Sequence, residues 1–207
     1  MARPALTDAE ERAMRSTILL QAARIIAARG YSALSMRTLA LEVGLSPGAL
    51  YRYFASKKEV LAAHASDAVG EMTARLRSIA DADLAPAQAA RAMLLEYCRF
   101  CAEDPDRFRV LFSHEAEEAA RCSTHSPAPS VQQAFALAES QVQLCLDSGD
   151  FQASSARSAT LVLWACAHGL VSLWSTITEI EIGDSQAFFE MGISTVLRGL
   201  RSESINT

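Results

Sequence analysis

The stretch SMRTLALEVGLSPGALYRYFASKK, residues 35–58, has the pattern of two short helices joined by a tight turn. Ser35 is suited to cap the first helix, because its hydroxyl can accept a hydrogen bond from an unpaired amide of the first turn. Four apolar residues then recur on one face of that helix: Met36, Leu39, Ala40 and Val43. Gly44 can adopt the positive φ that ends a helix, so the first helix is predicted to stop there.

The second short helix of this stretch is predicted to follow Leu45, which is expected to fill the corner between the two helices. Ser46 and Pro47 supply an N-cap and a first-turn proline. Leu50 and Phe54 then recur on the inward face. Two short helices at a glycine turn, packed under a preceding helix, predict a helix-turn-helix, whose later helix enters the major groove of DNA.

Longer helices are predicted on both sides of this stretch. Two of them begin at residue pairs with capping-box spacing: Thr7 with Glu10, and Ser56 with Glu59. These two helices are predicted over about 7–30 and 57–80, the second as a rod that connects the head to a body. Further helices are predicted at about 87–103, 106–118, 131–147, 155–182 and 185–201.

The predicted fold is all-α and has two domains. An N-terminal three-helix helix-turn-helix domain, residues 1–62, is joined by the long helix to a C-terminal helical ligand-binding and dimerisation domain, residues 63–207. The net charge of the chain is -5, but residues 1–60 hold nine Arg or Lys against five acids. The remaining residues hold ten basic and nineteen acidic side chains. A basic head on an acidic body therefore fits DNA as the partner of the head.

The cysteines and one long uncharged stretch indicate in which cellular compartment the chain is found. The five cysteines are an odd set within predicted helices, and no signal-peptide pattern precedes them, so a reducing cytoplasm is predicted. Residues 158–178 carry no charge and are long enough to span a bilayer. This run also contains His168, Gly169 and two Trp and lacks a clear basic flank, which favours a helix buried on several sides instead.

The outward face of the second short helix is the candidate DNA-reading surface. With Leu50 and Phe54 turned inward, five residues face the other way: Pro47, Gly48, Ala49, Tyr51 and Arg52. The small side chains of Gly48 and Ala49 would let the helix backbone approach the bases closely.

The run RTLALEVGLSPGALYRYFASKKEVL, residues 37–61, resembles the DNA-binding signature of the tetracycline-repressor (TetR) family of bacterial regulators. The matching residues are a Leu-Tyr-x-x-Phe element and the start of the next helix: Leu50, Tyr51, Phe54, Lys57 and Leu61. The resemblance covers roughly residues 10–65, and WACAHGLVSLW, residues 164–174, is similar to a dimer-helix signature of one branch of the family. The resemblance implies a three-helix reading head, an effector-binding helical body and a homodimer.

Roles within the head follow from side-chain chemistry. Arg37 and Arg52 are the candidates for base readout, because a guanidinium can pair with O6 and N7 of guanine. Lys57 is expected to hold a phosphate at a helix N-terminus. Four hydroxyl side chains are candidate phosphate donors: Thr38, Ser46, Tyr51 and Tyr53.

Several of these assignments have structural alternatives. Tyr51 or Tyr53 can pack the head with only the hydroxyl in water, and Arg52 can be a solvated surface residue. Three arginines near the N-terminus could reach DNA as an arm, or belong to a frayed end: Arg3, Arg12 and Arg15.

The body is expected to bind an effector and a second copy of the chain. Candidate pocket residues are aromatic or imidazole side chains, with ordinary core packing as the alternative for each: Phe100, Phe108, Phe112, His114, Trp164, His168 and Trp174. The last two predicted helices are expected to form the homodimer interface, as a symmetric four-helix bundle. Because a dimer must match the spacing of its half-sites, a ligand that tilts the connecting helix would alter DNA binding.

Metal and catalytic sites are not expected. Cys98 and Cys101 share a helical face, but with His114, Cys122 and His125 they do not have a zinc-site spacing. No catalytic or phosphate-cradling motif occurs, so neither an enzyme nor a cofactor is predicted. The predicted function is a cytoplasmic, dimeric, ligand-responsive transcriptional regulator, a repressor that leaves a palindromic operator when a small apolar or amphipathic effector binds. The alternative is a helical protein that binds or sequesters a small molecule without specific DNA binding.

Overall fold

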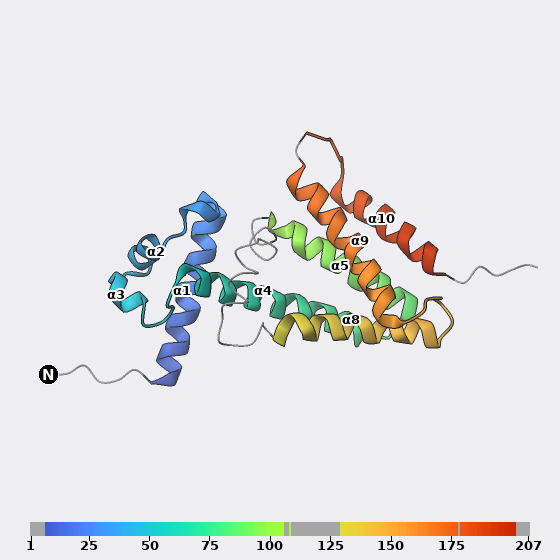
Figure 1. Ribbon diagram of the computed structural model, residues 1–207, viewed down its shortest axis with the longest axis horizontal. Coiled ribbons are helices and arrows are strands. Elements are labelled where there is room, and N and C mark those ends of the chain that lie inside the picture. The colour runs from blue at the N-terminus through green and yellow to red at the C-terminus, as the bar shows by residue number, and fades with distance from the viewer. Residues whose placement is uncertain (1–6, 106–107, 109–128, 178, 202–207) are drawn as a thin grey trace, which may run out of the picture. The chain divides into compact units, whose positions relative to one another are not determined.

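The computed structural model describes residues 7–105, 108, 129–177 and 179–201, and these residues are mostly helical (Figure 1). Within them the β-type pairing consists of one isolated bridge, between Phe151 and Arg201. The all-α prediction is therefore confirmed. The chain divides into two compact units, the first with residues 7–68 and the second with 69–105 and 129–201. The division lies inside helix α4 (Lys57–Ala80), as does the 62/63 boundary expected from the sequence.

The first unit contains α1 (Asp8–Arg29), the 3₁₀ turn η1 (Tyr31–Ala33), α2 (Met36–Val43), α3 (Pro47–Leu50) and the beginning of α4. The predicted start of α1 is confirmed. The Thr7 amide donates to the Glu10 carboxylate over 2.8 Å, and the Glu10 amide donates to the Thr7 hydroxyl over 3.3 Å. These hydrogen bonds favour the charged carboxylate and lower the pKa of Glu10.

The core of the first unit lies where α1 covers the inner faces of α2 and α3. The predicted inward residues Leu39, Leu50 and Phe54 are at most 1% exposed, and Leu45 is partly buried against the same core. Burying each such side chain stabilises the fold by about 1.5–3 kcal/mol. Ile18 and Ala22 of α1 complete this core, which fixes the outward direction of the opposite faces of α2 and α3.

In its described residues, the second unit contains four helices besides the later part of α4: α5 (Pro86–Glu103), α8 (Pro129–Asp147), α9 (Ala156–Thr176) and α10 (Ser185–Leu200). Helix α9 packs against α5, α8 and α10, and α5 also packs against α8 and α10. Fully buried side chains from each helix meet in this core: Phe100, Cys145, Ala167, Val171 and Ile193. The buried face of α9 therefore organises the body.

One of the helices expected from the sequence ends earlier in the structure, and another lies almost entirely outside the described residues. The helix expected over 155–182 ends at Thr176, where Ile177 takes an extended conformation. Thr176 and Ile177 are β-branched, and continuing the helix would put Glu179 and Glu181 at its negative end, so both features favour an earlier stop. Of the helix expected over 106–118, all but Phe108 lies outside the described residues.

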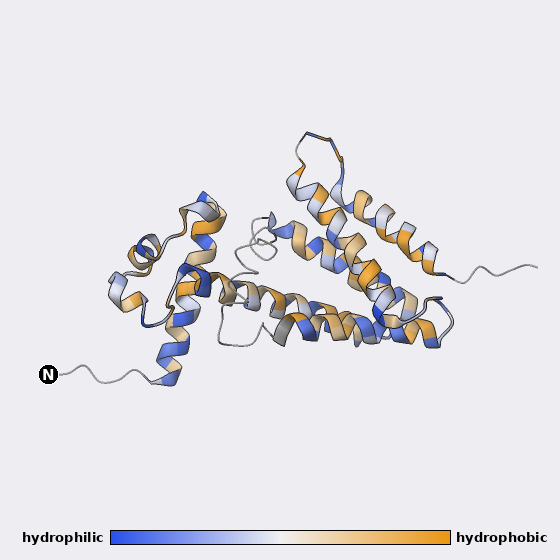
Figure 2. Ribbon diagram, in the orientation of Figure 1, coloured by the Kyte–Doolittle hydropathy of each residue, from blue (hydrophilic) through white to orange (hydrophobic). Residues whose placement is uncertain are grey.

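Helix α9 is long and apolar enough to cross a membrane, by length and composition alone, and it is the one such helix in the described ranges. A core helix passes the same test, and α9 packs on three neighbours. The expectation that it packs against several neighbours agrees with these contacts, but 33% of its apolar window is buried in the single chain, so part of the helix surface stays exposed. Apolar residues recur along α9 and α10 (Figure 2), and exposed ones include Leu161, Val162 and Leu173.

Candidate nucleic-acid interface

The two short helices of the head are held by caps and a glycine turn. The Ser35 hydroxyl accepts from the Thr38 amide over 3.0 Å, and the Ser46 hydroxyl accepts from the Ala49 amide over 3.2 Å. Gly44 lies between the helices with φ of 75°, in the left-handed region. No atom outside its own chain neighbours lies within 4 Å of the position where a Cβ would stand, so backbone conformation alone favours glycine.

The end of α3 differs from the predicted helix. Regular α-helix stops at Leu50, and the next amides turn back more tightly. The Arg52 amide donates to the Ala49 carbonyl over 3.3 Å, and the Tyr53 amide donates to the Leu50 carbonyl over 2.9 Å. Phe54 thus points into the core from a tight turn rather than from the helix itself.

The structure separates the predicted DNA-binding residues by exposure. Six are exposed: Arg37, Ser46, Pro47, Gly48, Tyr51 and Arg52. Three are partly buried: Thr38, Ala49 and Lys57. Tyr53 is 9% exposed and belongs to the core cluster of the head, so its ring packs the head, and only the hydroxyl remains as a possible phosphate donor.

The hydroxyl and charged groups on this face differ in whether they already form hydrogen bonds within the protein. The Thr38 and Ser35 hydroxyls hydrogen-bond to each other over 2.8 Å. The Ser46 hydroxyl accepts at its oxygen, which leaves its proton available for a phosphate. Within the part of the chain that the structure describes, Arg37 and Arg52 make no hydrogen bond or ion pair to the protein, so their guanidinium donors face solvent.

Arg15 of α1 holds the turn after α3, a role that the sequence interpretation missed. Its guanidinium donates to the Tyr53 carbonyl, lies 4.1 Å from the centroid of the Phe54 ring and is 3.7 Å from a Glu59 carboxylate oxygen. The hypothesis that Arg15 belongs to a DNA-binding arm is therefore wrong. A signal was present, because Arg15 precedes Ile18 and Ala22 by three and seven residues and so shares their face of α1.

The start of α4 is capped by the predicted pair in a modified form. The Glu59 amide donates to the Ser56 hydroxyl over 3.2 Å, but the Glu59 carboxylate accepts from the amide of Ala55 over 2.7 Å, one residue earlier than in a standard capping box. Lys57 is the first residue of α4. It therefore stands beside the helix-terminal amides, where a helix attracts anions.

The predicted effector residues do not form one cluster. Trp164 and His168 lie one turn apart on α9 with ring centroids 6.3 Å apart, but Phe100 is fully buried and lies 4.9 Å from the Arg75 guanidinium. Trp174 contacts Phe189 of α10 instead, at 6.1 Å. Phe108 is buried, and the candidates Phe112 and His114 lie outside the described residues.

Two residues that the sequence interpretation missed complete an aromatic cluster around Trp164 and His168. The Tyr97 hydroxyl of α5 forms a 3.0 Å hydrogen bond with His168 Nδ1, and the ring of Phe135 from α8 lies 6.3 Å from that of Trp164. Burial raises the pKa of Tyr97 and lowers the pKa of His168, so neutral forms are favoured. Tyr97 lies three residues before Phe100 on the same helical face, the one sequence feature that pointed to it.

Three of the described cysteines are buried in the way that small apolar side chains are. Cys98, Cys101 and Cys145 are buried, and burial raises the pKa of the Cys98 thiol to about 12 and that of Cys145 to about 11. Protonated thiols are poor metal ligands. In the residues with described positions, no three His, Cys, Asp or Glu side chains gather to hold a metal ion, and Cys122 and His125 lie outside those residues.

A capped helix-turn-helix with an exposed basic face, followed by a separate helical body, defines the class of two-part DNA-binding transcriptional regulators. Comparison with known families agrees: residues 18–64 match "Bacterial regulatory proteins, tetR family", and residues 90–196 match "Tetracyclin repressor-like, C-terminal domain". The chain therefore belongs to the tetR family. The predicted family and the predicted class, a DNA-binding transcriptional regulator, are both confirmed.

Individual relatives support this placement. The HTH-type transcriptional regulator PksA of Bacillus subtilis is 38% identical over 93 residues, which cover 45% of this chain and 44% of that protein. A Rhodococcus sp. RHA1 protein of unknown function has a similar structure, with a TM-score of 0.75, 21% identity, and 91% and 96% of the two chains covered. The ketosteroid transcriptional regulator KstR2 of Mycobacterium tuberculosis has a TM-score of 0.67 at 21% identity, with 91% and 95% covered. These two structures have the fold of this chain.

Proposed function

We propose that the chain is a dimeric, ligand-responsive repressor that reads a palindromic operator with the exposed face of α2 and α3. The observation that carries the proposal is this face itself. Within the described part of the chain, Arg37 and Arg52 have no partner there, while Arg15 and the core beneath hold the backbone in place. A side chain that already faces solvent on a rigid support can meet a base edge without first breaking contacts within the protein.

Base readout is assigned to Arg37 and Arg52, each worth about 1–3 kcal/mol of discrimination when it pairs with a guanine. Phosphate contacts are assigned to the hydroxyl groups and to Lys57, which fix the register of the head without reading sequence. Pro47, Gly48 and Ala49 present little side-chain bulk, so α3 can approach the groove closely.

The dimer is proposed to form through α9 and α10. Both helices expose large apolar side chains in the single chain, among them Val162 at 55% and Met191 at 63%. Leu170 of α9 lies against Gly192 of α10 so closely that a Cβ there would stand 2.5 Å from it, and this contact fixes the two helices as one surface. A symmetric pairing of that surface would bury the exposed apolar area in a four-helix bundle.

The effector is proposed to contact the aromatic cluster of Tyr97, Phe135, Trp164 and His168. Trp164 is 37% exposed, so a ligand can reach the cluster, and the rings favour an apolar or amphipathic molecule with one polar group for the Tyr97–His168 pair. The regulator KstR2, named for ketosteroids, has the same fold, which supports a body of this kind as the receptor of an apolar molecule.

A gel shift with fragments of genomic DNA tests the proposal. Retention of a few fragments that excess random duplex and moderate salt fail to displace is expected from sequence reading. Equal retention of all fragments, or none at low salt, would contradict it and would favour the sequestering alternative.

Effector response is tested by adding an apolar compound library to the retained complex. Compounds that release the DNA should also change the tryptophan fluorescence of the wild type, and this change should be lost in Trp164→Phe but kept in Trp174→Phe. These are the two tryptophans of the chain, so the paired variants assign the signal. Release of DNA without a Trp164 signal would place the effector elsewhere.

A further inference from the structure

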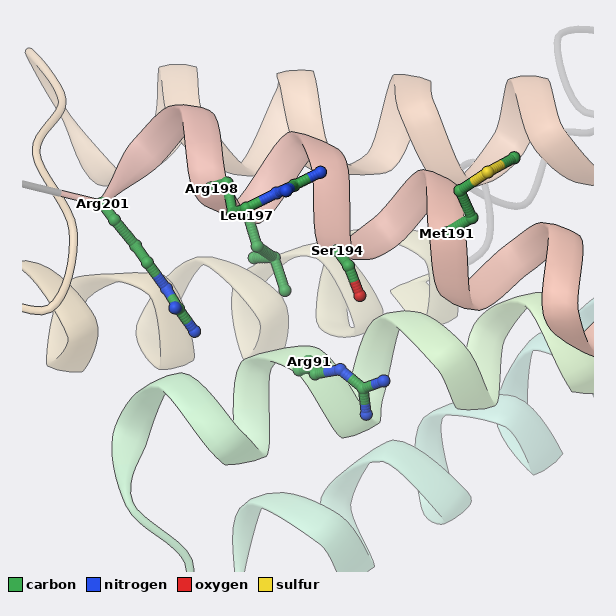
Figure 3. A pocket seen from close by; sticks show the side chains of 6 residues that line it. All are labelled: Arg91, Met191, Ser194, Leu197, Arg198 and Arg201. Carbon is green, nitrogen blue, oxygen red and sulfur yellow. The ribbon is translucent and has the colours of Figure 1, made fainter.

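A hollow of about 380 Å³ lies between α5 and α10, and none of its lining residues belongs to the aromatic cluster of Tyr97, Phe135, Trp164 and His168. Three of its six lining side chains are arginines, and none is acidic: Arg91, Met191, Ser194, Leu197, Arg198 and Arg201. Ser194, Leu197 and Arg201 point from α10 toward α5, where Arg91 lies, and Arg198 extends along α10 (Figure 3). The size is that of a small-molecule site, for which about 300–1,000 Å³ is usual.

The spacing along α10 explains why these side chains share one space. Met191, Ser194, Arg198 and Arg201 follow one another at intervals of three, four and three residues, which places them on one face of the helix. Leu197, 5% exposed, borders this face on the side toward α5 (Figure 3). The face is therefore basic and apolar together.

The arginines of the hollow contrast with the other arginines of this acidic body. Arg75 pairs with Glu71, Glu96 and Glu103, Arg99 pairs with Glu96, and Arg157 pairs with Glu139. Carboxylates are thus available to the body, and of its four other described arginines three are paired with them, while Arg77 is exposed and has no partner among the described residues.

No such pairing occurs in the hollow. Among the residues with described positions, Arg91 and Arg201 have no side-chain partner, and Arg198 has one neutral partner, the Thr195 hydroxyl at 3.3 Å. Arg201 points toward α5, where Arg91 lies, while Arg198 extends along α10 (Figure 3). Positive charges that line one hollow repel one another, so an anion that enters the hollow lowers this repulsion.

The ligand class follows from these groups. Guanidinium groups bind phosphate and carboxylate in a planar, bidentate manner, and the Ser194 hydroxyl can add a further hydrogen bond. Leu197 points toward α5 and offers apolar contact beside the charged groups, whereas Met191 lies at the edge of the hollow and points away from α5 (Figure 3). We propose that this hollow is a binding site for a small organic anion with a phosphate or carboxylate head and a short apolar tail. This site goes beyond the proposed effector cluster and does not depend on it.

Calorimetric titration of the full-length protein with hexyl phosphate tests the proposal, with hexanoate, inorganic phosphate and 1-hexanol as parallel probes. Hexyl phosphate or hexanoate is expected to bind saturably, at least about tenfold more tightly than inorganic phosphate, and 1-hexanol is expected not to saturate. Arg91→Gln and Arg201→Gln should each weaken this binding about tenfold or more, because each removes a charge-assisted hydrogen bond. Circular dichroism verifies that the variants are folded.

Matched controls decide between the hollow and other basic surfaces. Arg77→Gln removes one exposed charge from α4 and should leave the affinity unchanged, as should Arg52→Gln in the head. Equal weakening in Arg77→Gln would reveal a general charge effect, and loss in Arg52→Gln alone would place the anion on the head. Either result, or the absence of saturable binding, would overturn the proposal. The proposal would also be overturned if the wild type bound no anion and Arg91→Gln converted a wild-type dimer to a monomer. That result would assign the arginines to the contact between subunits.

Discussion

At the level of single residues, the fold of the head depends on a few residues that set the backbone conformation or leave a surface free of side chains. Gly44 supplies the left-handed turn between α2 and α3, and Gly48 supplies a small surface on α3. Neither position has a neighbouring atom that a Cβ would meet, yet only Gly44 has a positive φ. The two glycines therefore serve different purposes, and substitution separates them.

Gly44→Ala is expected to destabilise the head by about 1–2 kcal/mol, the cost of a left-handed conformation for an L-residue. Gly48→Ala should leave the fold unchanged or stabilise it by about 0.5–1 kcal/mol, because α3 is ordinary helix there. Hydrogen exchange of the α2 amides measures both changes. The same loss in both variants would contradict the role given to the turn.

Arg15 is the residue whose role changed most between sequence and structure. Arg15→Gln is expected to cost the head about 1–2 kcal/mol, since it removes a charge-assisted hydrogen bond to the Tyr53 carbonyl and a cation–π contact with Phe54. Arg12→Gln, an exposed change on the same helix, is the control and should have little effect. Chemical denaturation followed by exchange of head amides distinguishes them. Equal stability of the two variants would show that Arg15 does not hold the turn.

At the scale of elements, much of the head was predictable because its signals are local. Caps at Thr7, Ser35 and Ser46 and the turn at Gly44 involve residues within a few positions of one another, and all four are present in the structure. The early end of α9 was not predicted from its uncharged composition, since it depends on β-branched residues and on acids beyond them.

The effector candidates were harder to assign because side chains from three helices meet there. Tyr97, Phe135 and Trp164 belong to α5, α8 and α9 and become neighbours only through packing. An aromatic residue in the sequence does not show whether it contacts a ligand or the core. Phe100 and Trp174 were therefore grouped with Trp164, although the structure places them in other contacts.

Arg75 joins α4 to α5 through ion pairs, and a substitution at this residue tests how much these ion pairs stabilise the body. Its guanidinium reaches Glu96 over 3.2 Å and Glu103 over 3.0 Å on α5, beside Glu71 on its own helix. Glu96 is 9% exposed, so loss of Arg75 leaves a largely buried carboxylate with Arg99 as its remaining ion-pair partner in the described ranges.

Arg75→Met is expected to cost about 1 kcal/mol, because the exposed part of the network is screened by solvent. For a chain of this size that lowers the melting temperature by about 2–4 °C. Arg77→Met, two residues along α4 and exposed, serves as the control and should melt as the wild type does. Differential scanning calorimetry makes the comparison. Identical melting of both variants would show that the network does not join α4 to α5.

At the scale of the whole molecule, the proposed function requires two copies. Val162→Asp on α9 is expected to convert the dimer to monomer, since it would bury a charge at the centre of an apolar interface. Val131→Asp on α8 makes the same change at a residue of similar exposure outside the proposed interface, and should leave the dimer intact. Sedimentation velocity reports the mass of each. A dimer that survives Val162→Asp but not Val131→Asp would place the interface elsewhere.

The exposed face of α2 and α3 is proposed to read DNA sequence. The most direct test is selection from a randomised duplex pool, followed by affinity measurement on the enriched sequence and on random DNA. The wild type is expected to enrich a palindrome, Arg37→Ala to lose preference at one base step in each half-site, and Lys57→Ala to weaken binding to both DNAs alike. Failure to enrich any motif, or equal losses on both DNAs for Arg37→Ala and Lys57→Ala, would show that this face does not read sequence.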